Sequence, residues 1–187
     1  PMLTLVGHGD VIRCTALWQE KQAQENQATT TEWKQLAMTG SYDHTIRVWN
    51  VHDVDKGTKE DRCLAVLSHG APVEAMCLMK SEDPKVPVWL LSAGGTTIKG
   101  WNHVTGQCLS TVSTQHRKTI TSLLAVIRSD VDDDNKSKTL TWRILTSSLD
   151  GLLQFHSWDA ATGMLEHMYS TKVGDSITSV AADRSGN

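Results

Sequence analysis

The sequence predicts an all-β protein built from repeated four-stranded antiparallel units, which is the architecture of a β-propeller. Two recurring features support this prediction. A turn of small residues precedes a large ring by six positions in three stretches, and apolar and polar residues alternate between turn and ring, as in a half-buried strand. A histidine followed by a β-rich run recurs between these stretches. The three stretches are residues 39–50 (TGSYDHTIRVWN), 92–102 (SAGGTTIKGWN) and 147–156 (SSLDGLLQFH).

Each repeat begins with a histidine, namely His8, His69 or His116. The following runs, 11–17, 73–79 and 120–127, predict the first strand of each unit. A variable loop, a second strand, a tight turn, a third strand carrying the ring, a short loop and a fourth strand complete it. The sequence therefore predicts about three and a half blades, with units of roughly 8–67, 69–114 and 116–173 and the start of a further blade at 176–187.

The repeats are longer than the 40–45 residues or so that are usual for such blades. The rings at Trp49, Trp101 and His156 are 52 and 55 residues apart. Polar inserts account for the excess, and in an up-and-down blade they all emerge on one face. Such a face often binds partners, although drift in surface loops would give the same pattern. The inserts are residues 19–32, 80–85 and 129–138 after first strands, and 53–62 after a third strand.

Composition narrows the class of protein. The 187 residues are 39% hydrophobic and 21% charged, which is typical of a globular chain with a real core. A net charge of −3 argues against a protein that grips nucleic acid with its whole surface. None of the four cysteines has the spacing of a zinc or redox motif, so a reducing compartment is favoured. No apolar run has the length of a membrane span.

Four residue types in the first unit resemble a catalytic set: His8, Thr39 or Ser41, Asp43 and Trp49. We favour a structural interpretation. The carboxylate can accept from the histidine, the histidine can bond the hydroxyl, and the hydroxyl can bond the indole N–H, so that each buried polar group has a partner. A hydrolase would need the hydroxyl exposed beside an oxyanion site, and the sequence shows no sign of one.

The second unit has an incomplete version of this set. His69 and Trp101 are present, but Gly95 stands at the aspartate position. We interpret Gly94 and Gly95 as part of a hairpin between two strands, where glycine supplies a positive φ, rather than as a phosphate cradle.

The third unit departs from the pattern differently. His116 and Asp150 are present, but His156 stands at the ring position. Trp158 would point to the same face two residues later and could take over the packing. We therefore expect blades two and three to depend more on packing against neighbouring blades.

The remaining charged and metal-binding side chains suggest no cofactor. The eight histidines follow the repeat rather than a ligand cluster, and residues 130–134 (DVDDD) lack the glycine and terminal glutamate of a calcium loop. We therefore predict no metal site and no cofactor. Four basic residues on or near the tight-turn face, Arg47, Lys99, Arg117 and Lys118, could contact RNA phosphate or a partner; scattered surface charge is the alternative.

The strongest motif, residues 36–49 (LAMTGSYDHTIRVW), is a WD-repeat signature. The succession that follows is SHGAPVE at 68–74, SAGGTTIK at 92–99, HRKTITSL at 116–123 and LTSSLDG at 145–151. This order resembles the U3 small nucleolar RNA-associated protein 15 family, components of the small-subunit processome. The missing aspartate at Gly95 matches that family, whereas His156 and the acidic insert depart from it.

The resemblance implies a seven-bladed WD-repeat propeller followed by a helical domain, with the other blades and that domain outside this sequence. It implies a nucleolar, non-catalytic scaffold for small-subunit (18S) rRNA processing, with a link to rRNA transcription. Implied partners are other processome proteins, especially WD-repeat and helical-domain subunits, together with pre-rRNA contact, but no membrane and no small-molecule substrate. An adaptor subunit of another complex, such as a ubiquitin ligase or a trafficking coat, is the alternative; an enzyme ranks third.

Overall fold

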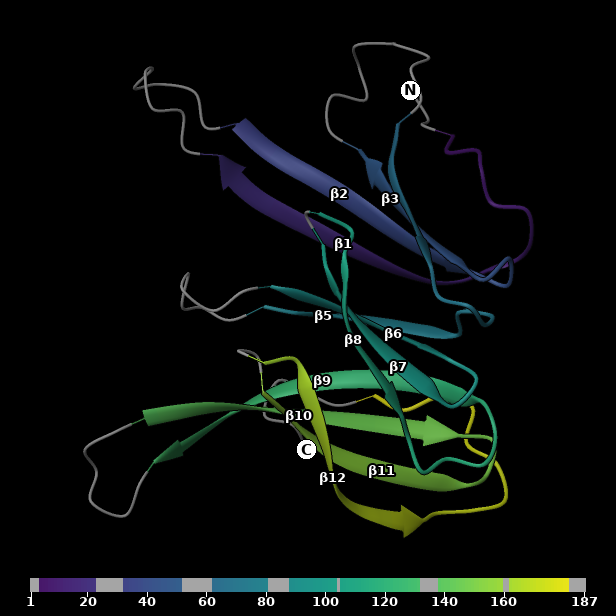
Figure 1. Cartoon of the computed structure of the whole chain (residues 1–187), viewed down its shortest axis with the longest axis vertical. Helices are drawn as coiled ribbons and strands as arrows, with labels where there is room; N and C mark the ends of the chain where they lie inside the picture. The colour runs from purple at the N-terminus through teal and green to yellow at the C-terminus, as the bar shows by residue number, and fades with distance from the viewer. Residues whose placement is uncertain are drawn as a thin grey trace.

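The computed structural model contains three four-stranded antiparallel sheets, stacked one after another along the longest axis of the molecule (Figure 1). The structure describes residues 4–22, 32–51, 62–80, 88–103, 105–131, 138–159 and 162–181. All regular structure in these ranges is strand. In the described part of the chain, no helix is long and apolar enough to cross a membrane.

Strand order within each sheet is chain order, so that hairpins join neighbouring strands in an up-and-down meander. This confirms the predicted all-β class and the four-stranded unit. We call the three sheets blades 1, 2 and 3. Blade 1 comprises β1 (Ile12–Gln22), β2 (Glu32–Ser41), β3 (Thr45–Asn50) and β4 (Cys63–Ser68); blade 2 comprises β5 (Ala75–Met79), β6 (Trp89–Gly94), β7 (Thr97–Asn102) and β8 (Cys108–Ser113); blade 3 comprises β9 (Ile120–Val131), β10 (Lys138–Ser148), β11 (Leu152–Asp159) and β12 (Met164–Lys172).

Two first strands are longer than the sequence indicated. β1 continues to Gln22, which pairs with Glu32, and β9 continues to Val131, which pairs with Lys138. Backbone pairing does not require apolar side chains, so these hairpins extend into residues that we had assigned to polar inserts. The rest of the predicted inserts, namely 23–31, 53–61, 81–85 and 132–137, lies outside the described residues. The prediction that they share a binding face therefore stays a prediction.

Residues 176–181, the predicted start of a further blade, form no strand in the structure. They run along blade 3, where Ile177 N donates to Ser148 O at 3.1 Å and Thr121 Oγ1 donates to Ile177 O at 2.7 Å. The same step joins the other blades, because Val73 N donates to Ser41 O at 3.0 Å. That a fourth sheet begins at these residues stays a prediction.

The core lies between the sheets rather than within one of them. Successive residues of a strand point to opposite faces of its sheet, so each neighbouring blade is contacted by one set of alternate residues. One cluster fills the space between blades 1 and 2, and another fills the space between blades 2 and 3. The first is built around Trp18, Met38, Ile46, Leu90 and Trp101; the second is built around Trp89, Leu91, Trp142, Ile144 and Trp158.

Trp89 shows how closely blades 2 and 3 pack. Its ring meets the Trp158 ring edge-on, with the centroids 5.1 Å apart. A Cβ added at Gly100 would come within 2.8 Å of the Trp158 ring and 3.2 Å of the Trp89 ring. Because Gly100 has no Cβ, the two indole rings can come into contact.

Replacing Gly100 with alanine should therefore destabilise the protein by about 1–3 kcal/mol, because the methyl group overpacks the contact between blades 2 and 3. Urea denaturation would measure the loss. Gly174→Ala is the matched control, because an added Cβ there meets nothing within 4 Å. Equal stability of the two variants would contradict this account of the packing.

Candidate functional site

The predicted polar residues of blade 1 form a chain of hydrogen bonds that joins two strands, the segment before β1 and the turn between β2 and β3. Trp49 Nε1 on β3 donates to Thr39 Oγ1 on β2 at 2.8 Å. Thr39 Oγ1 lies 2.7 Å from Nε2 of His8, which precedes β1. Nδ1 of His8 lies 2.8 Å from Oδ2 of Asp43 in the turn between β2 and β3.

Donor and acceptor chemistry fixes the direction of this chain. An indole can only donate, so the Thr39 oxygen accepts from Trp49 and its own proton goes to Nε2 of His8. Nδ1 of His8 then carries the ring proton and donates it to Asp43. Thr39 is 9% exposed, and its hydroxyl is engaged on both sides. The set therefore links strands and leaves no nucleophile open to a substrate.

Asp43 also ties the blade-entry segment to the turn. Its carboxylate accepts from Gly9 N at 2.9 Å, Thr45 N at 2.9 Å and the Thr45 hydroxyl at 2.6 Å. Burial acts to raise the pKa of this carboxyl, but the hydrogen bonds from Thr45, Gly9 and His8 outweigh it and lower the pKa well below its ordinary value. Asp43 therefore stays ionised and holds its four donors.

The sequence left Thr39 and Ser41 open as the shared hydroxyl, and the structure assigns that place to Thr39. Ser41 Oγ instead donates to Asp10 O at 3.1 Å and accepts from Asp43 N at 3.1 Å. Ser41 thus shapes the turn that carries the carboxylate.

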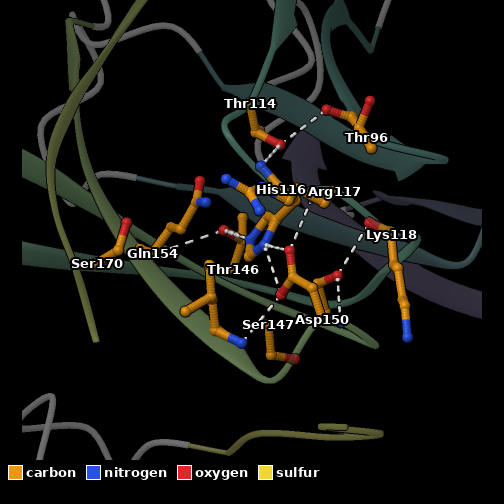
Figure 2. Close-up of polar contacts among 12 residues, drawn as sticks. Thr96, Thr114, His116, Arg117, Lys118, Thr146, Ser147, Asp150, Gln154 and Ser170 are labelled. Carbon is orange, nitrogen blue, oxygen red and sulfur yellow. Dashed lines mark hydrogen bonds and ion pairs between the residues drawn. The ribbon is translucent and has the colours of Figure 1, made fainter. Parts of the chain in front are cut away.

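Blade 3 contains a second chain of the same form, which Figure 2 shows in part. Nδ1 of His116 lies 3.1 Å from Oδ2 of Asp150, and its Nε2 lies 2.9 Å from Thr146 Oγ1. Thr146 Oγ1 is 3.4 Å from Nε2 of His156 on β11. His156 therefore occupies the place in the chain that an indole occupies in blade 1.

Trp158 has a different role from His156, although both are buried. It packs edge-on against Trp89 of blade 2, as described above.

Burial lowers the pKa of His156 to about 4, and the neighbouring rings of His167 and His116 act in the same direction. Burial also lowers the pKa of His116, against the opposing effect of Asp150. Both rings are therefore held neutral between the strands.

Blade 2 retains only the ring and the hydroxyl. Trp101 Nε1 donates to Ser92 Oγ at 2.8 Å. The turn of this blade is one residue shorter, because Ser92 precedes the ring by nine residues whereas Thr39 precedes Trp49 by ten. Gly95 has the positive φ predicted for it, 57°.

His69 does not join the chain that the sequence predicted for it. It is 3% exposed, and neither ring nitrogen has a hydrogen-bond partner among the described residues. Gly95 offers no carboxylate, and the ring packs against Gly94, where an added Cβ would lie 2.9 Å from it. Burial lowers the pKa of His69 to about 4, and the nearby charge of Lys99 adds to this.

The four basic candidates fall into two pairs. Arg47 lies over the Trp49 ring, with Cζ 5.9 Å from its centroid, and Lys99 lies over the Trp101 ring, with Nζ 5.7 Å from its centroid. Both precede their ring by two residues and help to cover it. Arg117 and Lys118 are exposed in the loop between β8 and β9.

Three contributors were absent from the sequence prediction. The hydroxyls of Ser92 and Thr146 complete blades 2 and 3, and their spacing of nine or ten residues before the ring could have indicated them. Arg13 Nε lies 3.2 Å from Glu74 Oε2, which joins blade 1 to blade 2. Its partner is 61 residues away, so no local pattern could have signalled this ion pair.

The described residues contain no group of three His, Cys, Asp or Glu side chains that could hold a metal ion. All four cysteines are free thiols. Burial raises the pKa of both Cys14 and Cys77 to about 12, so these two remain protonated and act as small apolar side chains.

Thr39→Val should destabilise the protein by about 2 kcal/mol or more, because it leaves His8 Nε2 and Trp49 Nε1 buried without a partner. Thr15→Val, at the exposed position that pairs with Thr39, is the control and should change stability by about 0.5 kcal/mol at most. Chemical denaturation of both variants checks this, and a Thr39→Val protein as stable as the control would refute the shared hydroxyl.

Stability should also fall in mild acid. The folded-state pKa of His69 and of His156 is about 4, below the ordinary 6.5, so the unfolded chain binds more protons between these values. The stabilisation is complete above pH 6.5 and should decrease as the pH falls to 4, by about 1.4 kcal/mol per pH unit for each histidine. Unfolding measured from pH 7 to 4 should give a shallower slope for His69→Leu than for wild type. The control Thr15→Val, which changes an exposed side chain that carries no titratable group, should keep the wild-type slope.

Comparisons with known proteins agree with this geometry. No protein-family model matches the chain. Over 158 residues, covering 84% of the chain, it is 30% identical to the U3 small nucleolar RNA-associated protein 15 homolog of Xenopus tropicalis. It is 29% identical over 86% of its length to mitochondrial division protein 1 of Schizosaccharomyces pombe. The chain spans about a quarter of the length of each of these relatives, 25% and 24%.

Solved structures show the same fold. The chain matches a chain of the mitotic checkpoint complex with a TM-score of 0.59, at 18% identity, over 81% of its own length and 40% of that chain. It matches the RRP9 WD40 repeats with a TM-score of 0.57, at 18% identity, over 92% of its own length and 42% of that chain. Together with the three sheets and their polar chains, these matches show that the protein has the WD-repeat β-propeller fold and that its sequence resembles U3 small nucleolar RNA-associated protein 15.

Proposed function

We propose that this chain is part of a non-catalytic scaffold of the small-subunit processome, which supports ribosome biogenesis. The observation that carries the proposal is the 30% identity to a U3 small nucleolar RNA-associated protein 15 homolog across 84% of the chain. That span is long enough to include most of the three blades. The similarity therefore extends over several repeats, whereas a similarity confined to one repeat could be shared by any WD-repeat protein.

The geometry supports a scaffold rather than an enzyme. The residues that resemble a catalytic set in blade 1 use their polar atoms on one another, and His8, Thr39 and Asp43 each come from a different part of the blade. In blade 3 the matching residues do the same. A blade locked in this way offers its faces and loops to partners, while its polar interior maintains the fold.

The proposed location, role in rRNA maturation and partners follow from the same resemblance. The protein would act in the nucleolus, where it would support processing of small-subunit (18S) pre-rRNA and contribute to rRNA transcription. Its partners would be other processome proteins, especially other WD-repeat and helical-domain subunits.

A second candidate is an adaptor subunit of another complex. The similarity to mitochondrial division protein 1, 29% over 86% of the chain, favours this alternative, because the same blade physics serves many assemblies. A ubiquitin ligase or a trafficking coat would be further examples of this class.

Affinity purification of the tagged full-length protein from its source cells distinguishes the two candidates. The scaffold proposal predicts that U3 small nucleolar RNA and small-subunit pre-rRNA co-purify with the protein, and that its depletion lowers mature 18S rRNA relative to large-subunit rRNA. A tagged protein that carries no such RNA and is recovered with mitochondria or a cytosolic complex would instead establish the adaptor.

A further inference from the structure

The loop that leads into blade 3 carries two adjacent cations that its counterparts lack. After the histidine, blade 1 has Gly9 and Asp10, and blade 2 has Gly70 and Ala71. Blade 3 has Arg117 and Lys118 at the same two positions. Formal charge on these loops therefore changes from −1 through 0 to +2 between blades 1 and 3.

In blade 3, the hydrogen bonds that the described residues form at these two positions use only the backbone of Arg117 and Lys118. Arg117 N donates to Asp150 Oδ2 at 2.8 Å, just as Gly9 N donates to Asp43 Oδ2 at 2.9 Å. The carbonyl of Lys118 accepts from Ser148 Oγ at 2.9 Å. Glycine performs the same task in blade 1, so the blade does not account for the two long basic side chains.

The backbone of the loop is held at both ends, so these side chains leave from fixed points. Upstream, Thr114 Oγ1 donates to Thr96 O at 2.8 Å and accepts from His116 N at 3.3 Å. Downstream, the two contacts to the turn between β10 and β11 hold Arg117 and Lys118. In Figure 2 the Lys118 side chain extends away from the cluster of hydrogen bonds. A fixed backbone reduces the conformational entropy that binding would cost.

This placement separates Arg117 and Lys118 from the other two basic candidates. The charges of Arg47 and Lys99 lie over indole rings within their blades. No ion pair involving Arg117 or Lys118 occurs among the described residues.

Neighbouring charges modify this surface without cancelling it. Asp150 is ionised, but its oxygens are held by His116, Arg117 N and Leu152 N. The exposed Lys172 pairs with Leu152 at the end of β12 and adds a third cation to this end of blade 3, and the exposed Asp175 follows it.

We propose that Arg117 and Lys118 form a contact point for the phosphate backbone of RNA. That the ligand is RNA rests on the function proposed above. Phosphate contacts need exposed, positioned cations and little apolar surface. A protein-binding hot spot would centre on a buried aromatic or apolar anchor, whereas none of the exposed residues of this loop, Gln115, Arg117 and Lys118, is apolar.

Fluorescence anisotropy of the full-length protein with a single-stranded RNA of mixed sequence tests this inference. The dissociation constant would be measured between low and moderate salt for wild type and for the double variant Arg117→Gln/Lys118→Gln. Loss of two phosphate contacts should reduce the slope of log affinity against log salt by about 1.4, since each contact to a single strand contributes about 0.7. The control Arg62→Gln/Lys80→Gln removes two charges from the opposite ends of the strands and should keep the wild-type slope.

The outcomes separate this inference from the proposed function. A slope that falls only in the Arg117→Gln/Lys118→Gln variant supports the contact, even if the protein proves not to associate with U3 RNA in cells. Unchanged RNA binding in that variant, equal losses in both variants, or no RNA binding by wild type would overturn it. If the variant binds RNA normally but loses an acidic protein from its purified complex, the pair serves a protein partner instead.

Discussion

One hydrogen bond recurs in every described blade and organises the rest: a ring on the third strand bonds a hydroxyl on the second. It joins Trp49 to Thr39, Trp101 to Ser92 and His156 to Thr146. The bond fixes a large side chain against the neighbouring strand of its own sheet. Because a buried ring nitrogen without a partner is costly, this pairing constrains the register of the two strands. The apolar residues on the same strands are then presented to the next blade.

The blades differ in how far the chain of hydrogen bonds extends beyond this bond. Blades 1 and 3 continue through a histidine to an aspartate in the turn, whereas blade 2 stops at the hydroxyl. Blade 2 is also the sheet that packs on both sides in the described structure, with Leu90 facing blade 1 and Leu91 facing blade 3. Packing on two faces can therefore stabilise a sheet whose polar chain is short. That blades 2 and 3 depend more on their neighbours stays a prediction, and in blade 3 His156 completes the chain that the sequence indicated as partial.

This division of roles also explains where function can reside. The histidines, hydroxyls and carboxylates that resemble catalytic residues use their hydrogen-bonding atoms on one another within blades 1 and 3. The exposed side chains of the loops vary from blade to blade, and this variation does not affect the polar interior. The residue after the histidine gives its N–H to the carboxylate whether it is Gly9 or Arg117. Such positions can acquire charge at little structural cost, and the pair Arg117 and Lys118 is the clearest case.

The class of fold, the four-stranded unit and the polar residues of blade 1 could all be predicted from the sequence. These depend on local spacing: alternation along a strand, a small-residue turn, and a ring six residues later. The positive φ at Gly95 followed from the same rules. The strand ends did not, because backbone pairing carried β1 and β9 into polar residues.

Which groups meet depends on how the sheets pack in three dimensions. This packing selected Thr39 over Ser41, paired His156 with Thr146, and left His69 outside the polar chain of its blade. It also brought Arg13 to Glu74, and separated Arg47 and Lys99 from Arg117 and Lys118. Each of these outcomes depends on the distance and direction between atoms on different strands. A linear pattern can supply the residue types for such contacts, but only the packed sheets determine their positions.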